Sequence, residues 1–192
     1  MKLFIALVHY PVLNRQGEKI CSAITNLDLH DISRTATTYG AEGFFVVTPS
    51  KEQQALAKRV MAHWQIGSGA EFNPDRKKAF SLVQLTDTID ETLARLPCER
   101  EKCLVLATSA RKHRRCIEWE HMEKIVQEME FECIVLLFGT ASGLHDECLL
   151  SCDGILCPIE GGTDYNHLSV RSAVAITLDR ITRFRRKQKW TS

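Results

Sequence analysis

Three segments rich in glycine and small polar residues are the parts of this sequence best suited to binding a ligand. They run from Thr108 to Arg111, from Gly139 to Leu144 and from Glu160 to His167, and each follows an apolar run. Small residues leave backbone N–H and C=O groups open to close approach by a ligand. In open α/β sheets, ligands bind at the carboxyl ends of the strands, where these segments would lie.

The glycines of the second segment do not belong to a common nucleotide-binding motif. Gly139 and Gly143 are not followed by the Gly-Lys-Ser/Thr of a P-loop, and no GxGxxG follows the first apolar run. ATP hydrolysis and a standard NAD site are therefore disfavoured. Spacing alone leaves open whether these glycines bind a ligand or only form a tight turn before a helix.

A polar segment from Thr25 to Arg34 could supply a proton acceptor or a phosphate ligand. His30 and Arg34 are four residues apart and would share a helical face. A cation beside a base suits phosphate binding and orientation of a nucleophile. Asn26 or Asp28 could equally be only an N-cap, and charged helix faces are common.

Alternating strand and helix patterns predict how these segments are positioned. Short apolar runs separated by amphipathic stretches are typical of a parallel sheet covered by helices. We expect one α/β domain over residues 1–192, with a mostly parallel six-stranded sheet. The expected strands are Leu3 to Val8, Phe44 to Val47, Leu82 to Leu85, Cys103 to Ala107, Cys133 to Phe138 and Ile155 to Ile159.

Helical patterns fill the intervals between these strands. Thr88-Ile89-Asp90-Glu91 has the spacing of a capping box and predicts a helix start. The longest pattern contains an apolar stripe of Val170, Val174, Leu178 and Ile181, which is most often core packing. The other expected helices are Leu29 to Tyr39, Glu52 to Trp64 and Trp119 to Met129, and the longest runs from Leu168 to about Arg186.

The net charge of only +1 gives no general sign of nucleic-acid binding. The positive charge is nevertheless concentrated in two clusters. Such clusters are often only solvated surface, but they could also hold a nucleic-acid backbone. They are Arg111-Lys112-His113-Arg114-Arg115 and a later group of Arg183, Arg185, Arg186, Lys187 and Lys189.

Eight cysteines are present without a CxxC pair, so their spacing does not indicate a metal site. We expect reduced, mostly structural cysteines in a cytoplasmic protein, and no zinc cluster of Cys148, Cys152 and Cys157. The apolar N-terminus is typical of a first strand and lacks the cleavage site of a signal peptide. No apolar run approaches the ~18 residues of a membrane span, so we expect a soluble protein.

Several motifs of this sequence occur together in one known family. They are Ala23 to Ile32, Leu137 to Thr140 and Tyr165 to Ala175, with further similarity at Tyr39-Gly40, Val47-Thr48-Pro49, His63-Trp64, Asn73-Pro74-Asp75-Arg76 and Thr108-Ser109-Ala110. With these motifs the chain resembles a bacterial family of SPOUT RNA methyltransferases. One departure stands in the second segment, where Ala141-Ser142-Gly143-Leu144 replaces the Gly-Trp-Gly-Leu expected in close relatives.

The resemblance implies methylation of a tRNA or rRNA with S-adenosylmethionine (SAM) as methyl donor. It also implies a C-terminal trefoil knot, a fold that pattern reasoning would not propose. The knot would hold SAM largely through backbone groups, and a homodimer would form with the long C-terminal helix at its interface. The implied cofactor residues are Thr108, Ser109, Phe138, Gly139, Thr140, Gly143, Leu144, Pro158, Ile159, Asn166, Leu168 and Ser169.

Methyl transfer needs an aligned nucleophile and a group that orients it or accepts its proton. On the resemblance, Arg34 would orient a phosphate or base, and Arg171 could assist or pair across the dimer. Rival interpretations are a noncatalytic SAM-binding regulator, a protein or small-molecule methyltransferase, and a flavodoxin-like or Rossmann-like enzyme that uses another nucleotide. The remaining candidates are Asp28, His30, Asp31, Asn166 and His167 for catalysis, and Arg111, Lys112, Arg114, Arg115, Arg185 and Arg186 for RNA.

Overall fold

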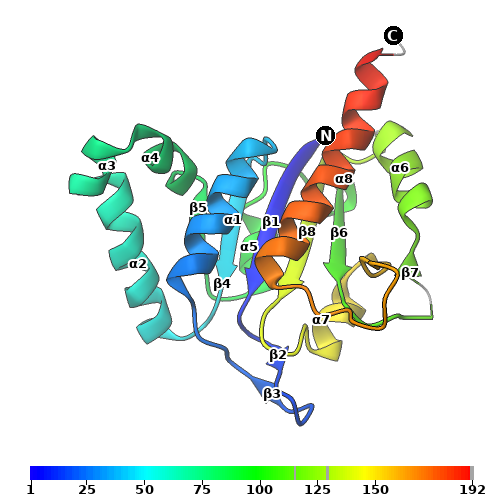
Figure 1. Ribbon diagram of the computed structural model, residues 1–192, viewed down its shortest axis with the longest axis horizontal. Helices are drawn as coiled ribbons and strands as arrows, with labels where there is room; N and C mark the ends of the chain where they lie inside the picture. Colours follow the sequence, from blue (N-terminus) through cyan, green and yellow to red (C-terminus); the bar gives the residue numbers. More distant parts are fainter. Residues whose placement is uncertain (115, 129, 191–192) are drawn as a thin grey trace.

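The computed structural model describes residues 1–114, 116–128 and 130–190, and side chains as far as Phe184. In this described part, seven strands form one sheet in the order β5-β4-β1-β8-β6-β9-β7, and neighbouring strands run parallel (Figure 1). The strands are β1 (Lys2–Val8), β4 (Gly43–Val47), β5 (Val83–Thr86), β6 (Cys103–Thr108), β7 (Cys116–Ile117), β8 (Cys133–Gly139) and β9 (Gly154–Leu156).

The predicted parallel α/β architecture is confirmed, but the sheet has one strand more than the six expected. The additional strand is β7, which pairs with β9 at the edge of the sheet. Its two residues are too few to show a strand pattern. A separate antiparallel hairpin, β2 (Val12–Leu13) and β3 (Lys19–Ile20), was also not predicted, for the same reason.

Helices cover both faces of the sheet and complete two buried apolar layers (Figure 1). The layer on one face includes residues of α1, α2, α4, α6 and α8, and the opposite layer includes residues of α5 and α7. The elements are α1 (Asn26–Thr38), α2 (Lys51–Gln65), α3 (Ser68–Phe72), α4 (Pro74–Phe80), α5 (Ile89–Ala94), the 3-10 turn η1 (Arg100–Lys102), α6 (Trp119–Glu128), α7 (Asp146–Ser151) and α8 (Val170–Trp190).

Helix α8 lies over the middle of the sheet, where it contacts α1, α6 and β8. Its Val174, Leu178 and Ile181 are fully buried in the core of the same chain. The resemblance placed this helix at a subunit interface, but its apolar stripe cannot supply that contact, because these side chains are already covered within one chain. The alternative interpretation as core packing is correct.

The cysteines depart from the expectation of eight reduced thiols. Cys116 and Cys157 form a disulfide, while the other six are free. The two residues are 41 positions apart, and the parallel pairing of β7 with β9 brings them together. Local spacing therefore could not predict the bond. Among the described residues, Cys116, Glu118 and Cys157 form one group within metal-ligand range, but two of its members are joined by this disulfide.

No helix among the described residues is both long enough and apolar enough to cross a membrane.

Candidate functional site

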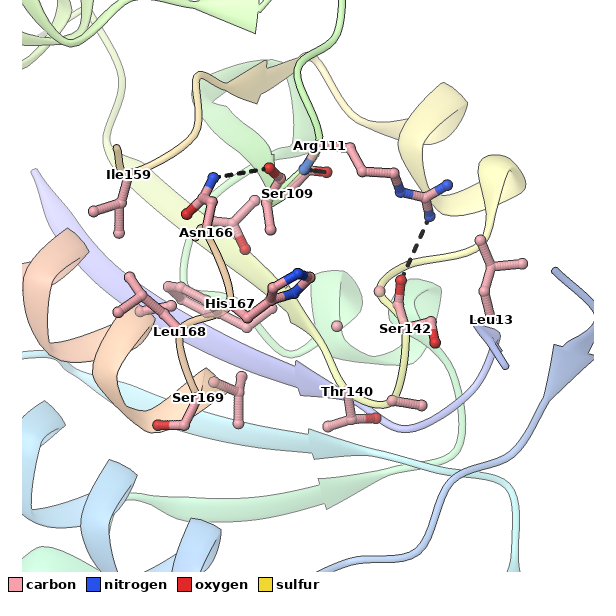
Figure 2. A pocket seen from close by; sticks show the side chains of 18 of the residues that line it. Leu13, Ser109, Arg111, Thr140, Ser142, Ile159, Asn166, His167, Leu168 and Ser169 are labelled. Atoms are coloured by element: carbon pink, nitrogen blue, oxygen red, sulfur yellow. Dashed lines mark hydrogen bonds between the residues drawn. The ribbon is translucent and has the colours of Figure 1, made fainter. Parts of the chain in front are cut away.

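A cavity of about 1040 Å³ lies beside the carboxyl ends of β6, β8 and β9, and the first turns of α1 and α8 border it (Figure 2). The three small-residue segments each contribute to its wall. The predicted residues that line it are Thr108, Ser109, Phe138, Gly139, Thr140, Gly143, Ile159, Asn166, Leu168 and Ser169 of the cofactor set, Asp28, Asn166 and His167 of the catalytic set, and Arg111 of the RNA set.

The other predicted residues lie elsewhere or outside the described residues. Leu144 is buried behind the wall, where it bridges to Val12. Pro158 is buried and does not line the cavity. His30, Asp31, Arg34, Lys112 and Arg114 do not line it, and Arg115 and the side chains of Arg185 and Arg186 are not described.

The loop after β8 is a tight turn that depends on glycine. A Cβ at Gly139 would lie 2.5 Å from the Leu144 nitrogen and 2.8 Å from the Gly143 carbonyl carbon. Gly143 and Ala141 have positive φ angles of 107° and 52°. The chain thus turns back on itself so closely that only glycine fits at position 139. This turn places main-chain groups, rather than long side chains, on the cavity wall.

Hydrogen bonds join the segments that form the wall. The Asn166 side chain donates to the Ala110 carbonyl oxygen at 3.2 Å, linking the segment before α8 to the loop after β6 (Figure 2). The Thr108 hydroxyl donates to the Leu137 carbonyl oxygen at 2.9 Å, linking β6 to β8. The cavity is therefore held by contacts between its own segments.

Asp28 is a nearly buried carboxylate on the cavity wall. Its side chain is 8% exposed, and its Oδ1 lies 3.0 Å from Nη1 of Arg171 in the first turn of α8. The Nε of Arg171 also lies 3.4 Å from Asp31. Arg171 thus pairs within its own chain, which disagrees with the suggested pairing across a dimer. The N-cap of α1 is Thr25, whose side chain accepts from the Asp28 N–H, so the Asp28 carboxylate is not the helix cap.

His30 lies among aromatic residues, away from the cavity. Its ring packs edge-on against Trp64 and Phe80, and its Nδ1 lies 2.8 Å from Nη1 of Arg76. Burial and the neighbouring Arg76 lower the pKa of His30. Successive helical residues are rotated by about 100°, so Asp28 and His30 point to different sides of α1.

A buried histidine just after β1 is linked through Ser22 to the loop after β8. His9 follows β1, and its Nδ1 lies 2.9 Å from the Ser22 hydroxyl. The Ser22 hydroxyl also bonds to the Thr140 hydroxyl, and both Ser22 and Thr140 line the cavity. His9 is fully buried, and this burial lowers its pKa from 6.5 to about 4 despite the nearby Asp28.

This shifted pKa predicts that acid weakens the fold. Below pH 6.5 the unfolded chain binds a proton at His9 before the folded chain does, so stability falls as the pH drops from 6.5 towards 4. We expect the loss to reach about 3 kcal/mol across this window. Urea unfolding at several pH values should show a smaller loss for His9→Gln. The exposed His121→Gln serves as control and should retain the wild-type dependence.

The sequence did not indicate that the segment between β1 and α1 forms one side of the cavity. Leu13, Asn14, Arg15, Gly17 and Ser22 all line it. The only available signal was the pair Asn14 and Gly17, which are typical turn residues and could have predicted a hairpin. Nothing in the residue types of this segment indicated a ligand.

Comparison with known proteins assigns the family. A family model described as SAM-dependent RNA methyltransferase matches residues 2–183. The chain belongs to this family. A tRNA (guanine-N(1)-)-methyltransferase from Oleidesulfovibrio alaskensis is 41% identical over 180 residues, covering 93% of this chain and 41% of that protein. An uncharacterized protein from Aquifex aeolicus is 36% identical over 93% of this chain and 87% of its own length.

The fold of this methyltransferase family member is also found in solved structures. The SpoU methyltransferase AviRb from Streptomyces viridochromogenes, in complex with the cofactor AdoMet, superposes with a TM-score of 0.59. It is 16% identical, and the match covers 96% of this chain and 58% of that one. The chain spans about two fifths of the tRNA methyltransferases that it matches.

The cavity of this family member suits SAM. Ile159, Leu168 and Val170 offer apolar surface for a nucleoside, and the closely turned main chain after Gly139 leaves backbone groups accessible. A ligand pocket of this kind is mainly apolar with a few placed polar groups.

Proposed function

We propose that this chain transfers a methyl group from SAM to a nucleotide of a tRNA or rRNA. The observation that carries the proposal is the cavity itself, which the three small-residue segments line together with Asp28. The name of the Oleidesulfovibrio relative specifies guanine N1, but that protein is more than twice as long as the matched segment. We therefore leave the acceptor atom open.

In this proposal, different residues of the cavity bind the cofactor, orient the nucleotide and contact it. SAM, when bound, supplies a methyl group on a positively charged sulfur. The loop after β8, with Ile159 and Leu168, holds the cofactor and excludes water from it. Asp28 orients the attacking nucleotide or accepts its proton, and Arg171 fixes the carboxylate in position. Asn166 and His167 lie on the cavity wall where they can contact the nucleotide.

The proposal is tested by methylation of RNA. Purified protein with methyl-labelled SAM should label total RNA from a strain that lacks this protein, and nucleoside mass spectrometry should then identify one modified nucleotide. RNA from the parent strain is the control and should accept less label, because its sites are already methylated. Calorimetric SAM binding without methylation of any RNA would contradict the proposal and favour the noncatalytic regulator.

We further propose that the chain acts as a cytoplasmic homodimer and that its C-terminal part is knotted. Support for the knot comes from α8, which follows β9 near one edge of the sheet yet lies over the sheet centre between α1 and α6. Leu27, at the start of α1, is exposed and available to a second subunit. A monomeric mass by light scattering at micromolar concentration would contradict the dimer.

A further inference from the structure

The β2–β3 hairpin forms a well-ordered arm at the cavity. Its turn is closed by main-chain bonds from the Asn14 N–H to the Glu18 oxygen and from the Gly17 N–H to the Asn14 oxygen. The Asn14 side-chain oxygen also accepts from the N–H groups of Gln16 and Glu18, both at 2.9 Å. Arg15 therefore projects from a turn whose main chain is fixed on both sides.

Further bonds attach this hairpin to the rest of the site. The Leu13 N–H donates to the Gly143 oxygen, and the Ser142 N–H donates to the Leu13 oxygen, both at 2.9 Å. Lys19 of β3 pairs with Glu147 of α7 at 3.0 Å. The hairpin is thus bound to the loop after β8, so the position of Arg15 is coupled to the wall of the cofactor cavity.

Arg15 and Arg111 give the cavity a positive charge that the described side chains do not neutralise. Both line the cavity and are exposed, and neither forms a salt bridge with another residue in the described part of the chain. The Arg111 guanidinium makes a long contact, 3.5 Å, with the Ser142 carbonyl oxygen (Figure 2). Among the described residues that line the cavity, Asp28 is the one carboxylate, and it is paired with Arg171.

Two guanidinium groups without an ion-pair partner among the described residues, both on the wall of one cavity, favour an anionic ligand. Guanidinium groups bind phosphate oxygens through paired N–H donors and keep their charge at all physiological pH values. SAM carries a net positive charge, so there is little net electrostatic attraction between the cofactor and the two arginines. The phosphates of an RNA strand that enters the cavity beside the cofactor match these groups in charge.

We propose that the β2–β3 hairpin is an RNA-binding arm, in which Arg15, together with Arg111, contacts a backbone phosphate next to the nucleotide to be methylated. This inference rests on the proposed function, because it assumes that the substrate is RNA. It adds Arg15, which lies outside the two basic clusters of the sequence, to Arg111, which belongs to the first of them. Phosphate contacts of this kind set register and affinity, while base selection is left to other residues.

The salt dependence of RNA binding tests whether the β2–β3 hairpin contacts RNA phosphates. Fluorescently labelled, unfractionated tRNA and rRNA from a strain lacking this protein are titrated with protein at salt concentrations between about 50 and 200 mM. Each lost phosphate contact lowers the slope of log affinity against log salt by about 0.7 to 0.9. Arg15→Gln should show this reduction, with unchanged SAM affinity and unchanged thermal unfolding, since Arg15 is exposed on a turn.

Two further variants serve as controls. Arg15→Lys keeps the charge and should retain most of the slope. Arg59→Gln removes an exposed arginine of α2 outside the cavity and should bind RNA like the wild type.

The outcomes separate this inference from the proposed function. If the RNA affinity of Arg15→Gln depended on salt as in the wild type, the hairpin would not be an RNA-binding arm, while the methyltransferase proposal would remain intact. A tenfold loss of SAM affinity in Arg15→Gln, without a change in RNA binding, would also overturn it and would assign Arg15 to the carboxylate of the cofactor. A wild-type protein that neither binds nor methylates tRNA or rRNA would overturn both proposals.

Discussion

Replacement of Gly139 by alanine should lower the affinity for SAM by about tenfold or more, which corresponds to about 1.4 kcal/mol. The new Cβ would lie 2.5 Å from the Leu144 nitrogen, so the main chain of the cavity wall has to move. Crowding of this kind also destabilises a fold by about 1–3 kcal/mol. Calorimetric titration with SAM and urea unfolding measure the two effects separately.

Gly161 provides a matched control in the segment before α8. A Cβ at Gly161 meets nothing within 4 Å. Gly161→Ala should therefore bind SAM and unfold like the wild type. If Gly139→Ala also bound SAM normally, the loop after β8 would not contact the cofactor, and the assignment of this cavity to SAM would be wrong.

Replacement of Asp28 by asparagine should reduce the rate of methyl transfer by about 10²–10⁴-fold, the range typical of a lost acid–base group. Asparagine has nearly the same shape and can still contact Arg171, but it cannot accept a proton at neutral pH. SAM affinity should stay near the wild-type value. Single-turnover methylation of RNA at saturating SAM measures the effect on chemistry apart from product release.

Asp31→Asn is the matched control for Asp28. Asp31 lies on the same helix and contacts the same Arg171, but its side chain is 47% exposed and does not line the cavity. Its removal should leave the rate nearly unchanged. Equal losses in the two variants would mean that the charge around Arg171, rather than the carboxylate in the cavity, supports the reaction.

Strands with several apolar residues were predictable from the sequence, because burial in a parallel sheet leaves a continuous apolar run. The run Cys133 to Phe138 agrees with β8 to within one residue. Short elements gave no such signal. Strand β7 and the β2–β3 hairpin contain two residues per strand, and their positions depend on distant partners such as Ile155 and Leu144.

The candidate site was predictable where it depends on loops that follow strands, and not where it depends on helix rotation or distant contacts. Small residues after β6 and β8 correctly indicated cavity-lining segments. The side of α1 that faces the cavity was not predictable, because Asp28, His30 and Arg34 are all polar. Only packing against Trp64 and the bond to Arg76 show that His30 faces away.

Strand β1 lies inside the sheet, between β4 and β8, although it precedes both of them in the sequence. One edge of β1 pairs with β4, which is synthesised soon after it. The other edge of β1 pairs with β8, so Lys2 has no strand partner on that side until Cys133 has been synthesised. Until the ribosome reaches β8, the nascent chain exposes one edge of a strand whose residues from Leu3 to Val8 are all apolar. Such an edge favours aggregation and slow folding. We therefore expect newly made chains to require a chaperone until β8 has formed.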